Sequence, residues 1–299
     1  NSGGTKTLTN VPHGTSVTFT ATADNGYEVD SWTGVTPTPS NSTTATLSNI
    51  DGDKNVTVKF KKTVYTVNYS VDGGHGNIKA DSGNLTIGGT VSVEHGGSVT
   101  FTATPSPGYN VKEWKVGNDV VTGNTSNTYT YTVTKAVTVK VSFLAGEAPY
   151  KVKHYKEKEE GGYPAEPTET EDKNGTVGTN AAYTPKTGGA YEGFTYKSGL
   201  TKINGTIQTS GPIQADGSTV VELYYERKTV NVTFKLAGGN VAGNTGPIVK
   251  TGKYGTAFTA PANPVKTDDI FEGWNPSLPS PLLYPASNAE YTAQWQAVP

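Results

Sequence analysis

The sequence predicts a mainly β protein made of small tandem modules with at most short helices, and three observations lead to this prediction. The 299 residues include 47 Thr and 30 Val but only 10 Leu and 8 Ile. Side chains branched at Cβ fit the pleated surface of a sheet, whereas leucine, the usual core residue of helices, is scarce. Short stretches alternate between apolar and polar residues, and part of the chain is internally repeated.

The alternating stretches place the strands, and clusters of Gly, Asn, Asp and Pro separate them. In the first half of the chain we expect strands at residues 16–23, 56–60, 65–71, 98–103, 128–133 and 137–143. In the second half we expect them at residues 150–155, 219–225, 230–234 and 291–295. Turns are predicted at residues 24–26, 51–53, 72–74, 105–108 and 237–240. The charged run 156–160 fits a loop or a single helical turn.

The internal repeat covers the first half of the chain. Residues 11–22 recur as residues 93–104, and the closing strand 56–60 recurs as 137–141. The pair Gly26-Tyr27 and Trp32 recur as Gly108-Tyr109 and Trp114. The first copy lacks a counterpart of the strand at residues 65–71, so we expect the chain to start partway into a repeat.

Length alone suggests about two domains, but the strand pattern divides better into four. We call them the first repeat, the second repeat, the third segment and the fourth segment, with the boundaries 1–62, 63–146, 147–228 and 229–299. Almost no linker separates them. Since short linkers limit hinge motion, the sequence predicts an elongated string of modules.

Composition excludes several kinds of function. The chain has no Cys and no Met, which excludes disulfides and thiolate chemistry. Its net charge is −2 and it has no basic stripe, so nucleic acid is not expected as a partner. No stretch of 18 apolar residues is present, so no membrane span is expected in this segment. The missing initiator Met is compatible with a leader or anchor that was removed.

The first two segments resemble the divergent InlB-type B-repeats of bacterial surface proteins over residues 1–145. The resemblance lies in the Gly-Tyr pair, a nearby Trp and a closing Val-Thr-Val-Lys strand; its residues are Gly26, Tyr27, Val29, Trp32, Gly108, Tyr109, Val111 and Trp114. It implies small β-grasp-like modules that occur in tandem on secreted and cell-surface bacterial proteins, commonly as stalks.

The other two segments resemble related modules. The fourth is similar to the Listeria–Bacteroides repeat over residues 229–296; the matching positions are Gly238-Gly239-Asn240, Tyr254-Gly255, Phe271-Glu272-Gly273-Trp274 and the closing Tyr291-Thr292-Ala293-Gln294-Trp295. It departs from that family at Asp268-Asp269, where Gly-Tyr is usual, and in the Pro-rich stretch 275–285. The third segment is similar to mucin-binding-protein (MucBP-like) modules through Gly178, Tyr183-Thr184-Pro185 and Gly193-Phe194.

Large aromatic residues recur in every segment, and two interpretations of them remain open. A module of this size buries little apolar area and needs aromatic anchors in its core. The alternative is an exposed aromatic row that stacks on sugar rings. Repetition favours the core interpretation, which gives the predicted structural anchors Tyr27, Trp32, Tyr109, Trp114, Phe194, Tyr196, Phe271, Trp274 and Trp295.

No residue pattern predicts a catalytic, cofactor-binding or metal site. The four histidines, which are His13, His75, His95 and His154, are spread over three segments, and no Ser, His and Asp set follows from spacing. Residues 51–55 begin like a calcium loop, but Val56 stands where Gly is needed and Lys62 where Glu is needed. Glu157, Glu159 and Glu160 are expected to lie in a solvated charge run.

The sequence therefore favours a non-catalytic, monomeric stalk of a secreted or cell-surface bacterial adhesin-like protein, which projects a head domain from the cell envelope. The alternative is a module that binds a host glycan, mucin or another extracellular protein through exposed aromatics. No cofactor is expected in either case.

Overall fold

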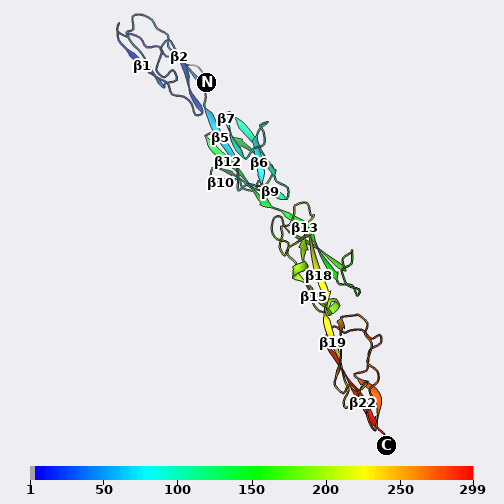
Figure 1. Cartoon of the computed structure of the whole chain (residues 1–299). Helices are drawn as coiled ribbons and strands as arrows, with labels where there is room; N and C mark the ends of the chain where they lie inside the picture. The colour runs from blue at the N-terminus through cyan, green and yellow to red at the C-terminus, as the bar shows by residue number, and fades with distance from the viewer. Residues whose placement is uncertain (1–3, 299) are drawn as a thin grey trace. The chain divides into compact units, whose positions relative to one another are not determined.

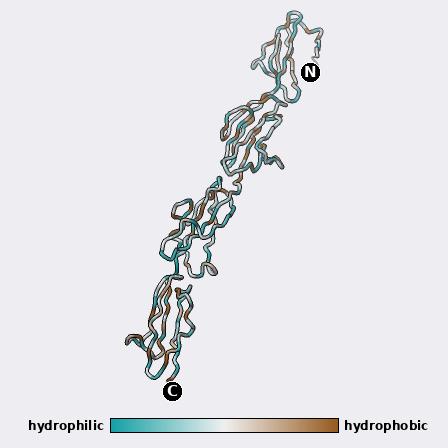
Figure 2. Tube along the Cα trace, turned by 90° about the vertical axis from the view of Figure 1, so that its right-hand side faces the viewer, coloured by the Kyte–Doolittle hydropathy of each residue, from teal (hydrophilic) through white to brown (hydrophobic). Residues whose placement is uncertain are grey.

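The computed structural model describes residues 4–298 and confirms that the protein is mainly β (Figure 1). Helical structure in this range is limited to two 3-10 turns, η1 (Gly189–Tyr191) and η2 (Ser198–Leu200). The chain forms two compact units, Asn1–Leu144 and Ala145–Pro299. Apolar and polar residues alternate along the strands of both units (Figure 2), as expected where one face of a strand is buried.

The first repeat consists of two small antiparallel sheets in the first unit. One joins β1 (Val17–Thr20) to β3 (Thr44–Leu47), and the other joins β2 (Tyr27–Thr33) to β4 (Thr57–Lys62). The predicted strand 16–23 is shorter than expected because its ladder ends at the pair of Thr20 with Thr44.

The second repeat packs a five-stranded sheet against a three-stranded one. The five strands lie in the order β10 (Asp119–Val120), β9 (Tyr109–Val116), β12 (Val137–Ala145), β5 (Val64–Asp72) and β7 (Gly88–Glu94). The three are β11 (Thr128–Thr132), β8 (Ser98–Pro105) and β6 (Gly76–Ala80). Side chains from both sheets form one core, in which Trp114 and Phe101 are fully buried.

The second unit contains two larger sheets. The third segment has β14 (Glu169–Thr176), β13 (Glu147–Lys156), β18 (Val220–Arg227), β16 (Lys202–Ile203) and β17 (Thr206–Ile207) in that order, and β15 (Phe194–Tyr196) also pairs with β18. The fourth segment has β20 (Ile248–Lys253), β19 (Thr229–Lys235), β22 (Ala289–Ala297) and β21 (Asp269–Asn275). Residues 156–160 end β13 and continue as a loop, so no helical turn forms there.

Three of the segments share one feature of topology: the opening strand lies beside the closing strand and runs parallel to it. The parallel pairs are β5 with β12, β13 with β18, and β19 with β22. Fully buried valines lie in these pairs, among them Val67, Val139, Val152, Val221 and Val232. The parallel pair therefore contributes fully buried side chains to the core of each of these three segments.

Candidate functional site: the junctions between sheets

Two junctions within the units consist of one residue each. Thr63 connects β4 to β5 in the first unit, and Lys228 connects β18 to β19 in the second. Where a linker is this short, its backbone must be hydrogen-bonded by the flanking sheets or by water. The geometry of these two residues therefore decides how freely the flanking sheets move relative to each other.

The backbone of Lys228 is held from both sides. Its N–H donates to the carbonyl oxygen of Gly193 in the preceding segment at 2.9 Å. Its carbonyl oxygen accepts from the N–H of Tyr254 in the following segment, also at 2.9 Å. The linker is thus an ordered connection and has the character of a short strand.

Thr63 repeats this arrangement in the first unit. Its N–H donates to the Gly26 carbonyl at 2.9 Å, and its own carbonyl accepts from the His95 N–H at 2.8 Å. Lys62 and Glu94 add an ion pair with 3.9 Å between Nζ and Oε2. In both linkers the N–H donates to the carbonyl oxygen of a glycine in the preceding segment. The carbonyl oxygen accepts from the N–H of an aromatic residue in the following segment.

In both junctions the ring packs directly on that glycine. A Cβ added at Gly193 would lie 2.1 Å from Cδ1 of Tyr254, and one at Gly26 would lie 2.0 Å from Cδ2 of His95. These separations are far below van der Waals contact, so only glycine permits the approach. We call the linker, the glycine and the ring the junction motif; its residues are Thr63, Gly26 and His95 in the first unit, and Lys228, Gly193 and Tyr254 in the second.

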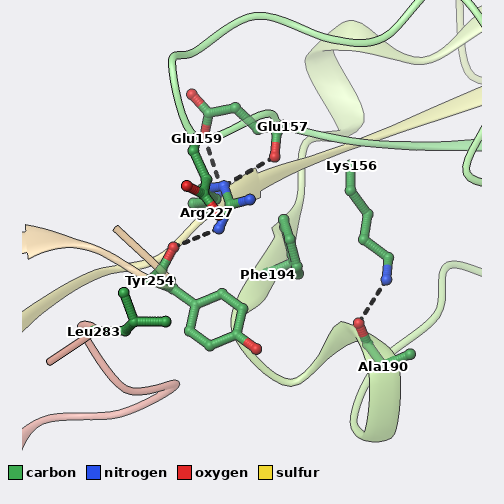
Figure 3. A pocket seen from close by; sticks show the side chains of 9 residues that line it. Lys156, Glu157, Glu159, Ala190, Phe194, Arg227, Tyr254 and Leu283 are labelled. Atoms are coloured by element: carbon green, nitrogen blue, oxygen red, sulfur yellow. Dashed lines mark hydrogen bonds between the residues drawn. The ribbon is translucent and has the colours of Figure 1, made fainter. Parts of the chain in front are cut away.

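Arg227 and Glu157 reinforce the junction in the second unit (Figure 3). Arg227 donates from Nε to the Glu157 carbonyl at 3.0 Å and from Nη1 to the Tyr254 carbonyl at 2.6 Å. One carboxylate oxygen of Glu157 accepts from the Arg227 N–H at 2.8 Å, and the other accepts from Nζ of Lys253. The guanidinium also lies over the rings of Phe194 and Tyr254, at 5.4 and 5.9 Å from the centroids.

The expectation that Glu157 is solvated is wrong. Its side chain is only 9% exposed, because it pairs with Arg227 at the end of β18 and with Lys253 at the end of β20. Burial alone would raise the pKa of this carboxyl, but the bonds from Lys253 and the Arg227 backbone outweigh it and lower the pKa. The charge of Glu157 is therefore retained and neutralised inside the junction.

A shallow hollow of about 470 Å³ opens beside these residues. Lys156 and Leu283 line part of it, but the Lys156 ammonium already donates to the Ala190 carbonyl at 2.7 Å (Figure 3). It also lies 4.4 Å from the centroid of the Tyr191 ring. The charged side chains of Lys156, Glu157 and Arg227 at its wall already bind other groups of the protein. We therefore interpret the hollow as part of the contact between the two segments and not as a reaction site.

The third segment contains a buried histidine that the sequence did not single out. His154 is fully buried, with Nδ1 2.8 Å from the Tyr225 hydroxyl and Nε2 3.0 Å from Oε1 of Glu171. A carboxylate only accepts, so Nε2 carries the proton and Nδ1 accepts from the tyrosine. Burial lowers the pKa of His154, and the nearby Glu171 opposes this shift only in part. The imidazole is therefore neutral and structural.

The predicted anchors differ in their burial. Trp114 is fully buried, whereas the other eight are partly exposed. Trp114 and Trp32 donate equivalent hydrogen bonds, to the Ser126 carbonyl at 2.9 Å and the Ser42 carbonyl at 2.8 Å. Phe271, Trp274 and Trp295 form one aromatic group on β21 and β22. The ring centroid of Phe271 lies 5.4 Å from that of Trp274 and 5.6 Å from that of Trp295. Phe194 packs edge-on against Tyr254 in the junction.

The other candidates stay apart from one another. His13 is exposed in a turn, and His75 stacks on Tyr109 at 4.2 Å between ring centroids. Asp51 forms an ion pair with Lys54 at 2.7 Å in the turn before β4. Across residues 4–298, no group of three or more His, Asp or Glu could hold a metal ion. No helix in the same range is long and apolar enough to cross a membrane.

Replacing Gly193 with Ala should loosen the second junction. The new methyl group must displace the Tyr254 ring, at an expected cost of about 1–3 kcal/mol for overpacking. We expect faster hydrogen exchange of the Lys228 and Tyr254 amides and faster proteolysis at the linker. Gly199→Ala is the matched control, because nothing lies within 4 Å of its added Cβ. Equal behaviour of the two variants would contradict the junction motif.

The third segment should lose stability in mild acid. The pKa of His154 is lower when folded than its usual 6.5, so the unfolded chain binds the proton more readily. Stability should fall as pH drops below about 6.5, before the carboxylates titrate. Amide exchange in β13 and β18 between pH 7.5 and 5.5 measures this, and His154→Gln should flatten the pH dependence whatever its effect on total stability. An unchanged slope would refute the assignment.

Residues 1–64 and 65–147 each match the family model described as the divergent InlB B-repeat domain. No curated protein sequence matches the chain. A solved structure titled "The Bacillus anthracis TIE protein" aligns with 95% of this chain and 68% of its own, at 7% identity and a TM-score of 0.34. The boundary between the two matches falls after Val64, one residue beyond the Thr63 linker. Residues 1–147 thus match the divergent InlB B-repeat model as two consecutive copies, which confirms the resemblance carried by the Gly-Tyr and Trp positions.

Proposed function

We propose that the chain is a non-catalytic spacer in a bacterial surface or secreted protein, a stalk that projects another domain from the cell envelope. Two consecutive B-repeat domains support this proposal, since that family typically supplies modules of bacterial surface proteins. We further propose that the third and fourth segments are separate modules and that each complete module is β-grasp-like, with the parallel pair of opening and closing strands as its centre. The stalk is proposed to be monomeric and extracellular.

The observation that carries the proposal is the parallel pairing of opening and closing strands. In a stalk under tension, force enters at the start of the opening strand and leaves at the end of the closing strand. In a parallel pair these two points lie at opposite ends of the ladder. The hydrogen bonds are then loaded together in shear, whereas a pair pulled from one end breaks them one at a time. The topology of β5 with β12, β13 with β18, and β19 with β22 suits a load-bearing role.

The junction motif supports the same role. A stalk transmits position as well as force, so its joints must resist bending. At Thr63 and Lys228, one residue between strands and two backbone hydrogen bonds leave little freedom for a hinge. The ion pair of Glu157 with Lys253 fixes the orientation of the third segment relative to the fourth more than it stabilises the fold. The cost of removing the two charges from water offsets much of their attraction.

Pulling single molecules of the full chain should test the load-bearing pair. Val139→Ala in β12 and Val133→Ala after β11 remove equally buried side chains from the second repeat, at about 2 kcal/mol each. We expect Val139→Ala to lower the unfolding force of this repeat markedly, since Val139 lies in the sheared ladder opposite Tyr69. Val133→Ala should lower equilibrium stability with a smaller change in force. Equal force losses would argue against the mechanism.

A second candidate function is binding of a glycan or extracellular protein, and the aromatic group of Phe271, Trp274 and Trp295 favours it. All three are partly exposed, and the Lys266 ammonium lies 5.7 Å from the Trp295 ring centroid. Titration with mucin glycopeptides, followed by tryptophan fluorescence, separates the two functions. Binding predicts a saturable change that Lys266→Ala weakens, whereas a pure spacer predicts none.

A further inference from the structure

The chain contains three Asn-Gly pairs, which are Asn25-Gly26, Asn174-Gly175 and Asn204-Gly205. In such a pair the backbone nitrogen of the glycine can attack the side-chain amide of the asparagine, because glycine has no side chain to obstruct the approach. The attack needs an asparagine side chain that is not held elsewhere and a peptide group between the two residues that can rotate. The three pairs differ in both respects.

Two of the pairs are held in place. Asn204 lies in the tight turn between β16 and β17, where its Oδ1 accepts from the Val220 N–H at 2.9 Å. Its own N–H donates to the Val220 carbonyl, also at 2.9 Å. Asn174 and Gly175 lie within β14, where Gly175 pairs with Ala148 of β13. A reaction at either pair must first break these bonds, which costs free energy.

The turn that contains Asn25 lacks these restraints. Asn25 is exposed, and the turn is closed by the Tyr27 N–H, which donates to the Asp24 carbonyl at 3.0 Å. This bond joins the two outer residues of the turn, so the central peptide group between Asn25 and Gly26 takes no part in it. Among the hydrogen bonds of residues 4–298, none involves the Asn25 side chain, its carbonyl or the Gly26 N–H. The central peptide group can therefore rotate while the turn stays closed.

The second repeat forms the same turn with a residue that cannot react. Pro107 stands there in place of Asn25. The turn is closed in the same way, by the Tyr109 N–H donating to the Ser106 carbonyl at 3.0 Å. The glycine that follows has a φ of 77° in the second repeat and of 81° in the first. Since the fixed φ of proline suits this position of a turn, asparagine at position 25 is not needed for the turn to form.

We propose that Asn25 is a site of spontaneous deamidation, and that the reaction loosens the junction at Thr63 as the protein ages. The nitrogen of Gly26 forms a bond to Cγ of Asn25, and the side-chain nitrogen leaves as ammonia together with the proton that Gly26 gives up. Water then opens the resulting succinimide ring at either of its two carbonyl groups. One product is an aspartyl residue, and the other is an isoaspartyl residue, in which the main chain runs through the former side chain. Neither step depends on the spacer role.

The products alter the junction motif directly. The isoaspartyl form adds one methylene group to the main chain just before Gly26, whose carbonyl accepts from the Thr63 N–H. The His95 ring packs so closely on Gly26 that not even a Cβ fits between them, so Gly26 cannot move toward the ring to absorb the added length. Both products also place a new carboxylate next to Asp24. We therefore expect the hydrogen bond from Thr63 to weaken.

Incubating the full chain at mildly alkaline pH in heavy-oxygen water, followed by digestion in mild acid and mass spectrometry, measures the reaction at all three sites. Conversion at Asn25 should be at least about tenfold faster than at Asn174 or Asn204, which corresponds to about 1.4 kcal/mol of activation free energy. In denaturant the three sites should react at similar rates, because the fold no longer restrains any of them. Similar rates in the folded chain, or an unchanged advantage of Asn25 in denaturant, would overturn the proposal.

Asn25→Pro is the matched control, because the second repeat has proline in the same turn. After incubation, the Thr63 and His95 amides of the wild-type chain should exchange faster with solvent, while those of the Asn25→Pro chain should not change. The Lys228 amide of the other junction should stay equally protected in both. Asn25→Ser, which also lacks the side-chain amide, replaces the control if proline disturbs the turn. Complete conversion at Asn25 with unchanged exchange at Thr63 would refute the loosening of the junction. The pulling experiment tests the spacer role separately.

Discussion

The parallel pairing of the first and last strands of a segment is the constraint on which the rest of the structure depends. Residues far apart in the chain must meet to form it, so it closes the whole segment before any ladder bond is gained. Once formed, it brings Val67 beside Val137 and Val152 beside Val221, and the remaining strands add to either side.

The pairing also determines what a junction must do. At Lys228 the closing strand β18, inside one sheet, runs into the opening strand β19, inside the next, so this linker connects two cores. Glycine at positions 26 and 193 allows a ring of the following segment to approach the backbone closely. The two junctions use different rings, imidazole and phenol, for the same contact. Both junctions have the same two backbone hydrogen bonds at the linker, and they differ in the ring that packs on the glycine.

Local pattern predicted the strands well because alternation is a local property. Each strand expected from residues 56–60, 65–71, 98–103 and 128–133 is present. The pairing of β5 with β12 was not predictable from alternation, since it depends on contacts about 70 residues apart. Glu157 was misjudged for the same reason: its neighbours in the chain are charged and solvated, but its partners Arg227 and Lys253 come from distant strands. Gly26 and Gly193 were noted in the sequence as parts of Gly-aromatic dipeptides, but their packing against the rings of His95 and Tyr254 was not predicted.

The single-residue linkers restrict how such a chain can change in length over evolution. Side chains of a strand alternate between two faces, so one residue inserted at position 63 or 228 would turn the next opening strand over and place its apolar face in solvent. The same insertion would separate the linker from both of its hydrogen-bond partners. Insertions are instead tolerated in the turns at the surface of each sheet. Duplication or loss of a whole segment leaves every linker intact, so genes for chains of this kind should lengthen and shorten in units of complete modules.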